Sequence, residues 1–135
     1  MIYELHLNAL DGQLPPITTL IKALTEAGIA CQPQPAGTAD GGADYFSIGD
    51  SAHGLEVTVI DGVISFSVPV TYHGQAAREV FDMVWKAARY VQTVIPTPLF
   101  DPQLGHPISV DNAFDIEKVL MAYAGLVRHL QSFEL

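Results

Sequence analysis

Cysteine is almost absent from this chain, which has a single one, Cys31, among 135 residues. One thiol can form neither an intrachain disulfide nor a cysteine-rich zinc site. A reducing compartment suits such a chain, so we expect a cytoplasmic protein. A lone cysteine is more often a small buried residue than a nucleophile, and we assign Cys31 no chemistry.

Basic residues are also scarce. Six Lys and Arg stand against fifteen Asp and Glu, which gives a formal net charge of -9. A chain with this charge is repelled by phosphate backbones and by anionic lipid. The composition therefore predicts no nucleic-acid partner and no membrane partner.

Long apolar runs are missing as well. The longest stretch without a charged residue, 62–77, contains Ser65, Ser67 and Pro69 and is shorter than the ~20 apolar residues that span a bilayer. Residues 1–6 lack the basic cluster of a secretory signal. Since 49% of the residues are nonetheless hydrophobic, we expect one folded domain covering residues 1–135, with a sizeable core.

Recognisable catalytic motifs are lacking. Ser47 and Ser51 lie in no Gly-x-Ser-x-Gly turn, and no Lys follows the glycines near residue 41 as a phosphate loop requires. Five histidines include no His-x-x-x-His pair, and His53 with Glu56 is spaced for a helix but falls in a turn and strand. A carboxylate pair for hydrolysis stays open among the acids of 40–50, which suit turns equally well. We expect no enzyme, no metal site and no cofactor.

What the chain does contain is clear alternation of apolar and polar residues. This period of two predicts four strands, at 2–8, 45–48, 55–60 and 63–70. Asp61-Gly62, between the last two, is a strong hairpin signal. Because Ser65 and Ser67 alternate with apolar residues, we expect one sheet face to be buried and the other to be wet.

Helical spacing of apolar residues predicts three helices. They are expected after Pro15-Pro16 and up to Gly28, at 75–95 ahead of Pro96, and from Asp111, as a capping residue, to Leu130. The segments 31–42 and 96–107, rich in Pro and Gly, are expected to be loops. Strands joined by tight turns, with helices grouped on one side, indicate an α+β fold: a two-layer sandwich in which two or three helices cover an antiparallel sheet of about four strands.

The acidic charge is concentrated in the first part of the chain. Residues 1–77 hold eight acids and one base, and no Lys or Arg occurs between Lys22 and Arg78. A surface of one sign accelerates encounter with a partner of the opposite sign, although it also keeps an apolar protein soluble. The hypothesis that this region docks a basic partner assigns the contact to Asp40, Asp44, Tyr45, Asp50, Glu56 and Asp61. Tyr45 and Phe46, beside Asp44, are the expected aromatic anchors.

The connector 97–105 contains the segment Phe100-Asp101-Pro102-Gln103. It is similar to an aromatic-Asp-Pro-Gln segment of small bacterial domains that accompany secreted toxins, and the chain resembles the immunity proteins of type VI and polymorphic toxin systems. The resemblance implies a compact, cytosolic, non-enzymatic protein and carries no binding residue over. In structural terms, the segment predicts a buried aromatic ring followed by an Asx turn.

Together these observations favour an immunity protein that binds a cognate toxin and occludes its active site, with its acidic region toward basic residues of the toxin. The alternative is a small-ligand-binding or regulatory α+β domain. A deep apolar pocket with convergent polar groups favours the alternative, and a flat acidic face favours the inhibitor. The sequence carries no signal for an oligomeric state or for the chemistry of the toxin.

Overall fold

The computed structural model describes residues 2–8, 17–33, 44–49, 53–60 and 62–133. Its strands form one antiparallel sheet in the order β2-β3-β4-β5-β1-β6-β7. The strands are β1 (Ile2–Asn8), β2 (Cys31–Pro33), β3 (Asp44–Gly49), β4 (Gly54–Ile60), β5 (Val63–Pro69), β6 (Leu99–Asp101) and β7 (His106–Ile108). The helices are α1 (Ile17–Glu26), α2 (Gly74–Val94) and α3 (Ala113–Phe133). The α+β class is therefore confirmed.

The expected strand count of about four is wrong, because the described residues alone form a sheet of seven strands. The four predicted strands are present as β1, β3, β4 and β5. The other three, β2, β6 and β7, lie in the segments that we expected to be loops, and each has three residues. Alternation is not visible over three residues, so pairing with longer neighbours decides these strands.

The hairpin predicted at Asp61-Gly62 joins the two strands at the centre of the sheet. Ile60 of β4 pairs with Val63 of β5, and Gly62 has a φ of 80°. Only glycine adopts such a left-handed conformation at little cost, which explains this residue in the turn. Asp61 lies outside the described residues.

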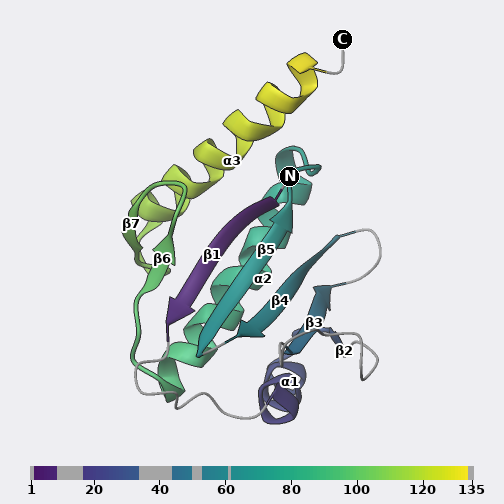
Figure 1. Ribbon diagram of the computed structural model, residues 1–135, viewed down its shortest axis with the longest axis vertical. Helices are drawn as coiled ribbons and strands as arrows, with labels where there is room; N and C mark the ends of the chain where they lie inside the picture. Colours follow the sequence, from purple (N-terminus) through teal and green to yellow (C-terminus); the bar gives the residue numbers. More distant parts are fainter. Residues whose placement is uncertain (1, 9–16, 34–43, 50–52, 61, 134–135) are drawn as a thin grey trace.

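One face of the sheet is buried under the helices. In Figure 1, α2 runs behind β1, β4 and β5, and Phe81 on this helix is completely buried. The Phe81 ring lies 5.8 Å from Tyr3 of β1, 5.7 Å from Trp85 and 5.0 Å from Tyr123 of α3, measured between ring centroids. An aromatic cluster thus joins the sheet to two helices.

The flanking helices complete this layer. Leu20 and Leu24 of α1 are buried, and Leu20 lines one small cavity with Val91 near the end of α2. On α3, Val119, Tyr123 and Val127 face inward, as the spacing predicted.

The predicted cap of α3 is wrong. The helix begins at Ala113, so Asn112 occupies the capping position, and its side-chain oxygen accepts a hydrogen bond from the Phe114 amide at 2.9 Å. Asp111, one residue too early to cap the helix, forms an ion pair with Arg89 at 3.1 Å.

Phe81→Ala tests the position of the core. Removing a fully buried ring from the centre of the aromatic cluster leaves a cavity, so we expect the free energy of unfolding to fall by about 3–5 kcal/mol in urea denaturation. Met121→Ala is the control, because 71% of Met121 is exposed on α3 and the change should stay within about 0.5 kcal/mol. Equal effects of the two substitutions would contradict this core.

Candidate functional site

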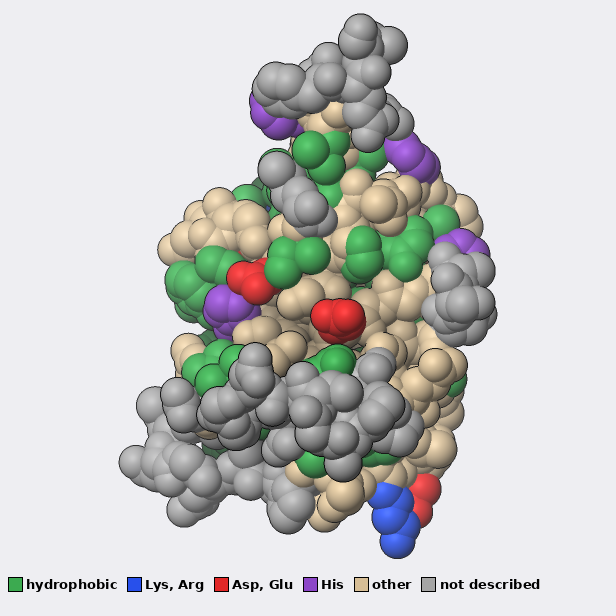
Figure 2. Space-filling view, turned by 45° about the vertical axis from the view of Figure 1, so that its right-hand side comes forward, with side chains coloured by type: hydrophobic (Ala, Val, Ile, Leu, Met, Phe, Trp, Pro, Cys, Tyr) green, Lys and Arg blue, Asp and Glu red, His purple; other side chains and the backbone are tan. Residues whose placement is uncertain are grey.

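The second face of the sheet is covered by none of the described helices, and we call it the open face. Alternate residues of each strand point to it, as the predicted wet face requires: in β5, Ser65 and Ser67 are partly exposed while Ile64, Phe66 and Val68 are buried. Figure 2 views the molecule obliquely from this side, and acidic and histidine side chains lie among polar and apolar ones on it.

Two of the six residues assigned to partner binding lie on the open face. Tyr45 of β3 pairs with Thr58 and is partly exposed, and Glu56 of β4 is exposed. Their strands are neighbours, so the structure brings these two side chains onto one surface. Asp44 begins β3 in register with Val59. The remaining three, Asp40, Asp50 and Asp61, lie outside the described residues. The expectation that Phe46 is an anchor is wrong, because this side chain is completely buried in the core.

The register aligns polar residues in a row across five strands. Starting at β2 and ending at β1, successive pairs join Gln32, Ser47, Glu56, Ser67 and Glu4. Paired residues on one face stand about 5 Å apart. Glu56 therefore lies between two serines, and Glu4 is about 10 Å from it, two strand spacings away.

A second row runs beside the first. It joins Tyr45, Thr58, Ser65, His6 and Phe100 by the pairings of five neighbouring strands. Small hydroxyl side chains flank Glu56 in the first row and lie near the middle of the second, and aromatic rings lie at the ends of the second. The open face is therefore a shallow polar surface between two aromatic side chains.

A groove of about 410 Å³ lies over the first row. Its lining includes Gln32, Ser47, Glu56 and Ser67, with Ile2 and Tyr72 near one end of the strands. The turn beside it depends on Gly49, which has a φ of 95°, and a Cβ there would lie 2.2 Å from the carbonyl oxygen of His53. Only glycine fits this turn, which sets the register that places Ser47 beside Glu56.

Charge is divided between the two layers of the fold. All six Lys and Arg lie on helices: Lys22 on α1, Arg78, Lys86 and Arg89 on α2, Lys118 and Arg128 on α3. The described strands hold no Lys or Arg, while Glu4 and Glu56 lie on the open face. Glu4 has His6 within 3.5 Å, a contact that is an ion pair only when the imidazole is protonated. The open face therefore carries negative charge without a neighbouring cationic side chain from its own strands.

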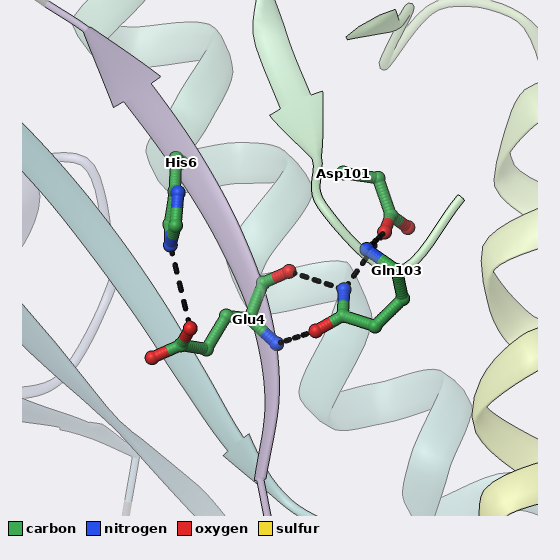
Figure 3. A network of polar contacts seen from close by, with 4 residues as sticks. All are labelled: Glu4, His6, Asp101 and Gln103. Atoms are coloured by element: carbon green, nitrogen blue, oxygen red, sulfur yellow. Dashed lines mark hydrogen bonds and ion pairs between the residues drawn. The ribbon is translucent and has the colours of Figure 1, made fainter. Parts of the chain in front are cut away.

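Gln103 holds the backbone of β1 beneath Glu4. Its side-chain oxygen accepts a hydrogen bond from the Glu4 amide at 3.0 Å, and its side-chain nitrogen donates to the Glu4 carbonyl at 2.7 Å (Figure 3). Strand β6 pairs with β1 only at His6 and Leu7. The side-chain amide of Gln103 thus replaces the missing strand partner of Glu4.

Asp101, which is fully buried, orients Gln103. One carboxylate oxygen accepts hydrogen bonds from the Gln103 amide at 2.8 Å, the Gln103 side chain at 2.7 Å and the Leu104 amide at 3.0 Å. The other accepts a hydrogen bond from the Tyr3 hydroxyl. The hydrogen bond that the Gln103 amide donates to Asp101, two residues earlier, confirms the predicted Asx turn. The expectation that the Phe100 ring is buried is wrong, because Phe100 is only half-buried. The buried ring beside Asp101 is that of Tyr3.

Glu4, His6 and the central hydroxyl residues were not assigned to the site from the sequence. Their signal was present, since Glu4 and His6 alternate with the buried residues of β1, and Ser65 and Ser67 with those of β5. The alternation of apolar and polar residues along one strand does not predict which strands are neighbours in the sheet. The strand order β4-β5-β1 places these residues in the same two rows as Glu56 and Tyr45.

The described residues offer little to a nucleophile or a metal. Burial raises the pKa of the Cys31 thiol, which lowers the reactive thiolate fraction. Within the described ranges, no three His, Cys, Asp or Glu side chains come together in a group that could hold a metal ion. The chemistry present on the open face is hydrogen-bond acceptance by carboxylates and hydroxyls.

No protein-family model matches this chain, and neither a curated protein nor a solved structure matches it. Among the helices that the structure describes, none is long and apolar enough to cross a membrane.

The Tyr3–Asp101 contact predicts a loss of stability at high pH. Burial, followed by the hydrogen bond to Asp101, raises the pKa of Tyr3 well above its ordinary value of 10.0. The folded state therefore keeps a proton that the unfolded chain releases. The free energy of unfolding therefore does not depend on Tyr3 titration below pH 10.0. Above this pH it falls, by up to about 1.4 kcal/mol per pH unit for one group.

Urea denaturation between about pH 9 and about pH 11 measures this slope. In Tyr3→Phe the slope should be shallower, with a residual part from Tyr123, whose pKa burial also raises. An unchanged slope in Tyr3→Phe would show that Tyr3 does not titrate in this way.

Proposed function

We propose that this chain is an immunity protein that binds a cognate bacterial toxin and occludes its active site, with the open face toward a basic surface of the toxin. The observation that carries the proposal is the row of Gln32, Ser47, Glu56, Ser67 and Glu4 on a face that no described helix covers. The charge layout and the resemblance of the connector to immunity proteins support it. On this proposal the protein is not an enzyme.

The geometry around Glu56 suits an arginine or lysine of the partner. Its neighbours in the row, Ser47 and Ser67, are short, so a guanidinium can approach the carboxylate from above the sheet. A carboxylate accepts two parallel hydrogen bonds from arginine, which makes such a contact directional as well as attractive. Because strands are rigid, the backbone and side chains lose little conformational freedom when the partner binds.

The size of the open face fits a protein partner. Five strands at about 4.8 Å spacing extend roughly 19 Å from β2 to β1, and a strand of seven residues is about 23 Å long. Tyr45 and Phe100 add apolar contact at the ends of the second row, as aromatic anchors do in protein interfaces. A toxin that holds a phosphate-bearing substrate with basic residues presents the complementary charge.

The proposal includes a location and excludes other partners. An inhibitor of this kind acts in the cytoplasm of the cell that makes the toxin, where the toxin must be neutralised. Nucleic acid and anionic membranes are poor partners for a face without Lys or Arg on its described strands. A cofactor has no role in inhibition by occlusion.

Substitution on the open face tests the proposal. Co-expression in bacteria with the protein encoded by the neighbouring gene shows whether the chain restores growth. We expect Tyr45→Ala and Glu56→Lys to abolish protection and to weaken binding about 30-fold or more, because each removes an anchor of the interface.

The control is Asp82→Lys, which makes the same charge change on α2, where Asp82 is exposed and pairs with Lys86. It should retain protection. All three variants should melt close to the parent, since exposed charges contribute little to folding and Tyr45 lies on the partly exposed face outside the core. If Asp82→Lys alone lost protection, the interface would lie on the helices. If Tyr45→Ala unfolded the protein, Tyr45 would be part of the core and not an interface anchor.

Association should depend on ionic strength. If opposite charges steer the encounter, raising the salt from about 0.05 M to about 0.5 M should lower the association rate constant about tenfold or more, because the screening length shortens from about 14 Å to about 4 Å. Stopped-flow fluorescence with the purified partner measures this rate. An association rate constant that does not change with salt concentration would rule out electrostatic steering.

A further inference from the structure

A second groove lies on the helix side of the molecule, between the start of α2 and the middle of α3, and we call it the α2–α3 groove. Its volume is about 270 Å³. Figure 1 shows α3 passing the beginning of α2 and continuing beyond the sheet. Apolar side chains of both helices line the groove, namely Ala77 from α2 and Leu120, Ala124 and Val127 from α3.

Arginines from the two helices also line the groove, as do Tyr72, His73 and Gly74 at the start of α2. Arg78 comes from α2 and Arg128 from α3. Arg78 also forms two hydrogen bonds with Glu117, at 2.9 and 3.3 Å, and this carboxylate is not part of the lining. Two guanidiniums thus face one carboxylate in this region, so the charge around the groove is positive.

Tyr123 gives the groove a neutral floor. Its hydroxyl donates a hydrogen bond to the Pro69 carbonyl and accepts one from the Tyr72 amide at 3.0 Å. Burial raises the pKa of Tyr123 further above its ordinary value of 10.0, so the phenol is uncharged at neutral pH. With its hydroxyl engaged on the sheet side, Tyr123 offers the groove its ring.

We propose that the α2–α3 groove binds a small organic anion, in which an apolar body lies against Leu120, Ala124 and Val127 and a carboxylate contacts Arg128 and Arg78. A cavity of roughly 150 Å³ holds a benzene molecule, so this groove has room for one ring with a short acidic chain. Carboxylate bound by guanidinium forms charge-assisted hydrogen bonds, and the apolar wall favours a ring over a bare ion. This site is separate from the open face and goes beyond toxin binding.

Titration of the full chain followed by ¹H–¹⁵N correlation spectra tests the site with three probes. They are 3-phenylpropanoate, its neutral amide 3-phenylpropanamide, and inorganic phosphate. We expect 3-phenylpropanoate to shift the amides of 74–78 and 120–128 in a saturable way. The amide and phosphate should each bind about tenfold more weakly, because one lacks the charge and the other the apolar body. Equal binding of either probe, or shifts confined to other segments, would overturn the proposal.

Arg128→Ala should weaken 3-phenylpropanoate binding about tenfold, the effect of losing a charged hydrogen-bond partner. Lys118→Ala is the matched control, since it removes the same charge from the same helix outside the groove, where the Lys118 ammonium lies 5.0 Å from the centre of the Phe114 ring. It should bind like the parent. Both variants should keep the parent's spectrum elsewhere, and parent-like affinity of Arg128→Ala would show that the arginine does not hold the anion.

Discussion

The buried carboxylate of Asp101 is the interaction on which the arrangement of this protein depends most. A charge removed from water is costly unless hydrogen-bond donors surround it, and Asp101 receives donors from Tyr3, Gln103 and Leu104. Satisfying it brings the first strand, the short strand β6 and the following turn together. Among the described residues, every buried side-chain nitrogen or oxygen has a hydrogen-bond partner, so this network is part of a fully paired interior.

The consequences of this contact reach both faces of the sheet. On the buried side, Tyr3 packs against Phe81 and Tyr123, and so joins β1 to α2 and α3. On the other side, Gln103 continues the sheet where β6 has ended, which holds the backbone under Glu4. The segment Phe100-Asp101-Pro102-Gln103 therefore acts structurally, because Asp101 and Gln103 support the open face from beside it.

The separation of charge between the layers gives the molecule two surfaces of different chemistry. The strands present carboxylates and hydroxyls, and the helices carry every Lys and Arg. On the helices, several of these cations are paired at the surface, as Arg78 is with Glu117 and Lys86 with Asp82. Exposed pairs of this kind contribute little to stability. The distribution matters instead for recognition: a strand face without Lys or Arg suits the basic partner that we propose, and the arginines of the α2–α3 groove suit the proposed small anion.

The sequence by itself determined the elements that are long enough to show a period. The alternation in β1 and β5, the apolar stripe of α2 and the Asp61-Gly62 hairpin each depend on neighbours along the chain, and so does the wet face of the sheet. The tertiary structure decided the three-residue strands and the row that places Glu56 between Ser47 and Ser67. These features depend on residues far apart, such as Tyr3 and Asp101, which are 98 positions apart. A local pattern says which side of a strand faces water, but only packing decides which strand lies next to it.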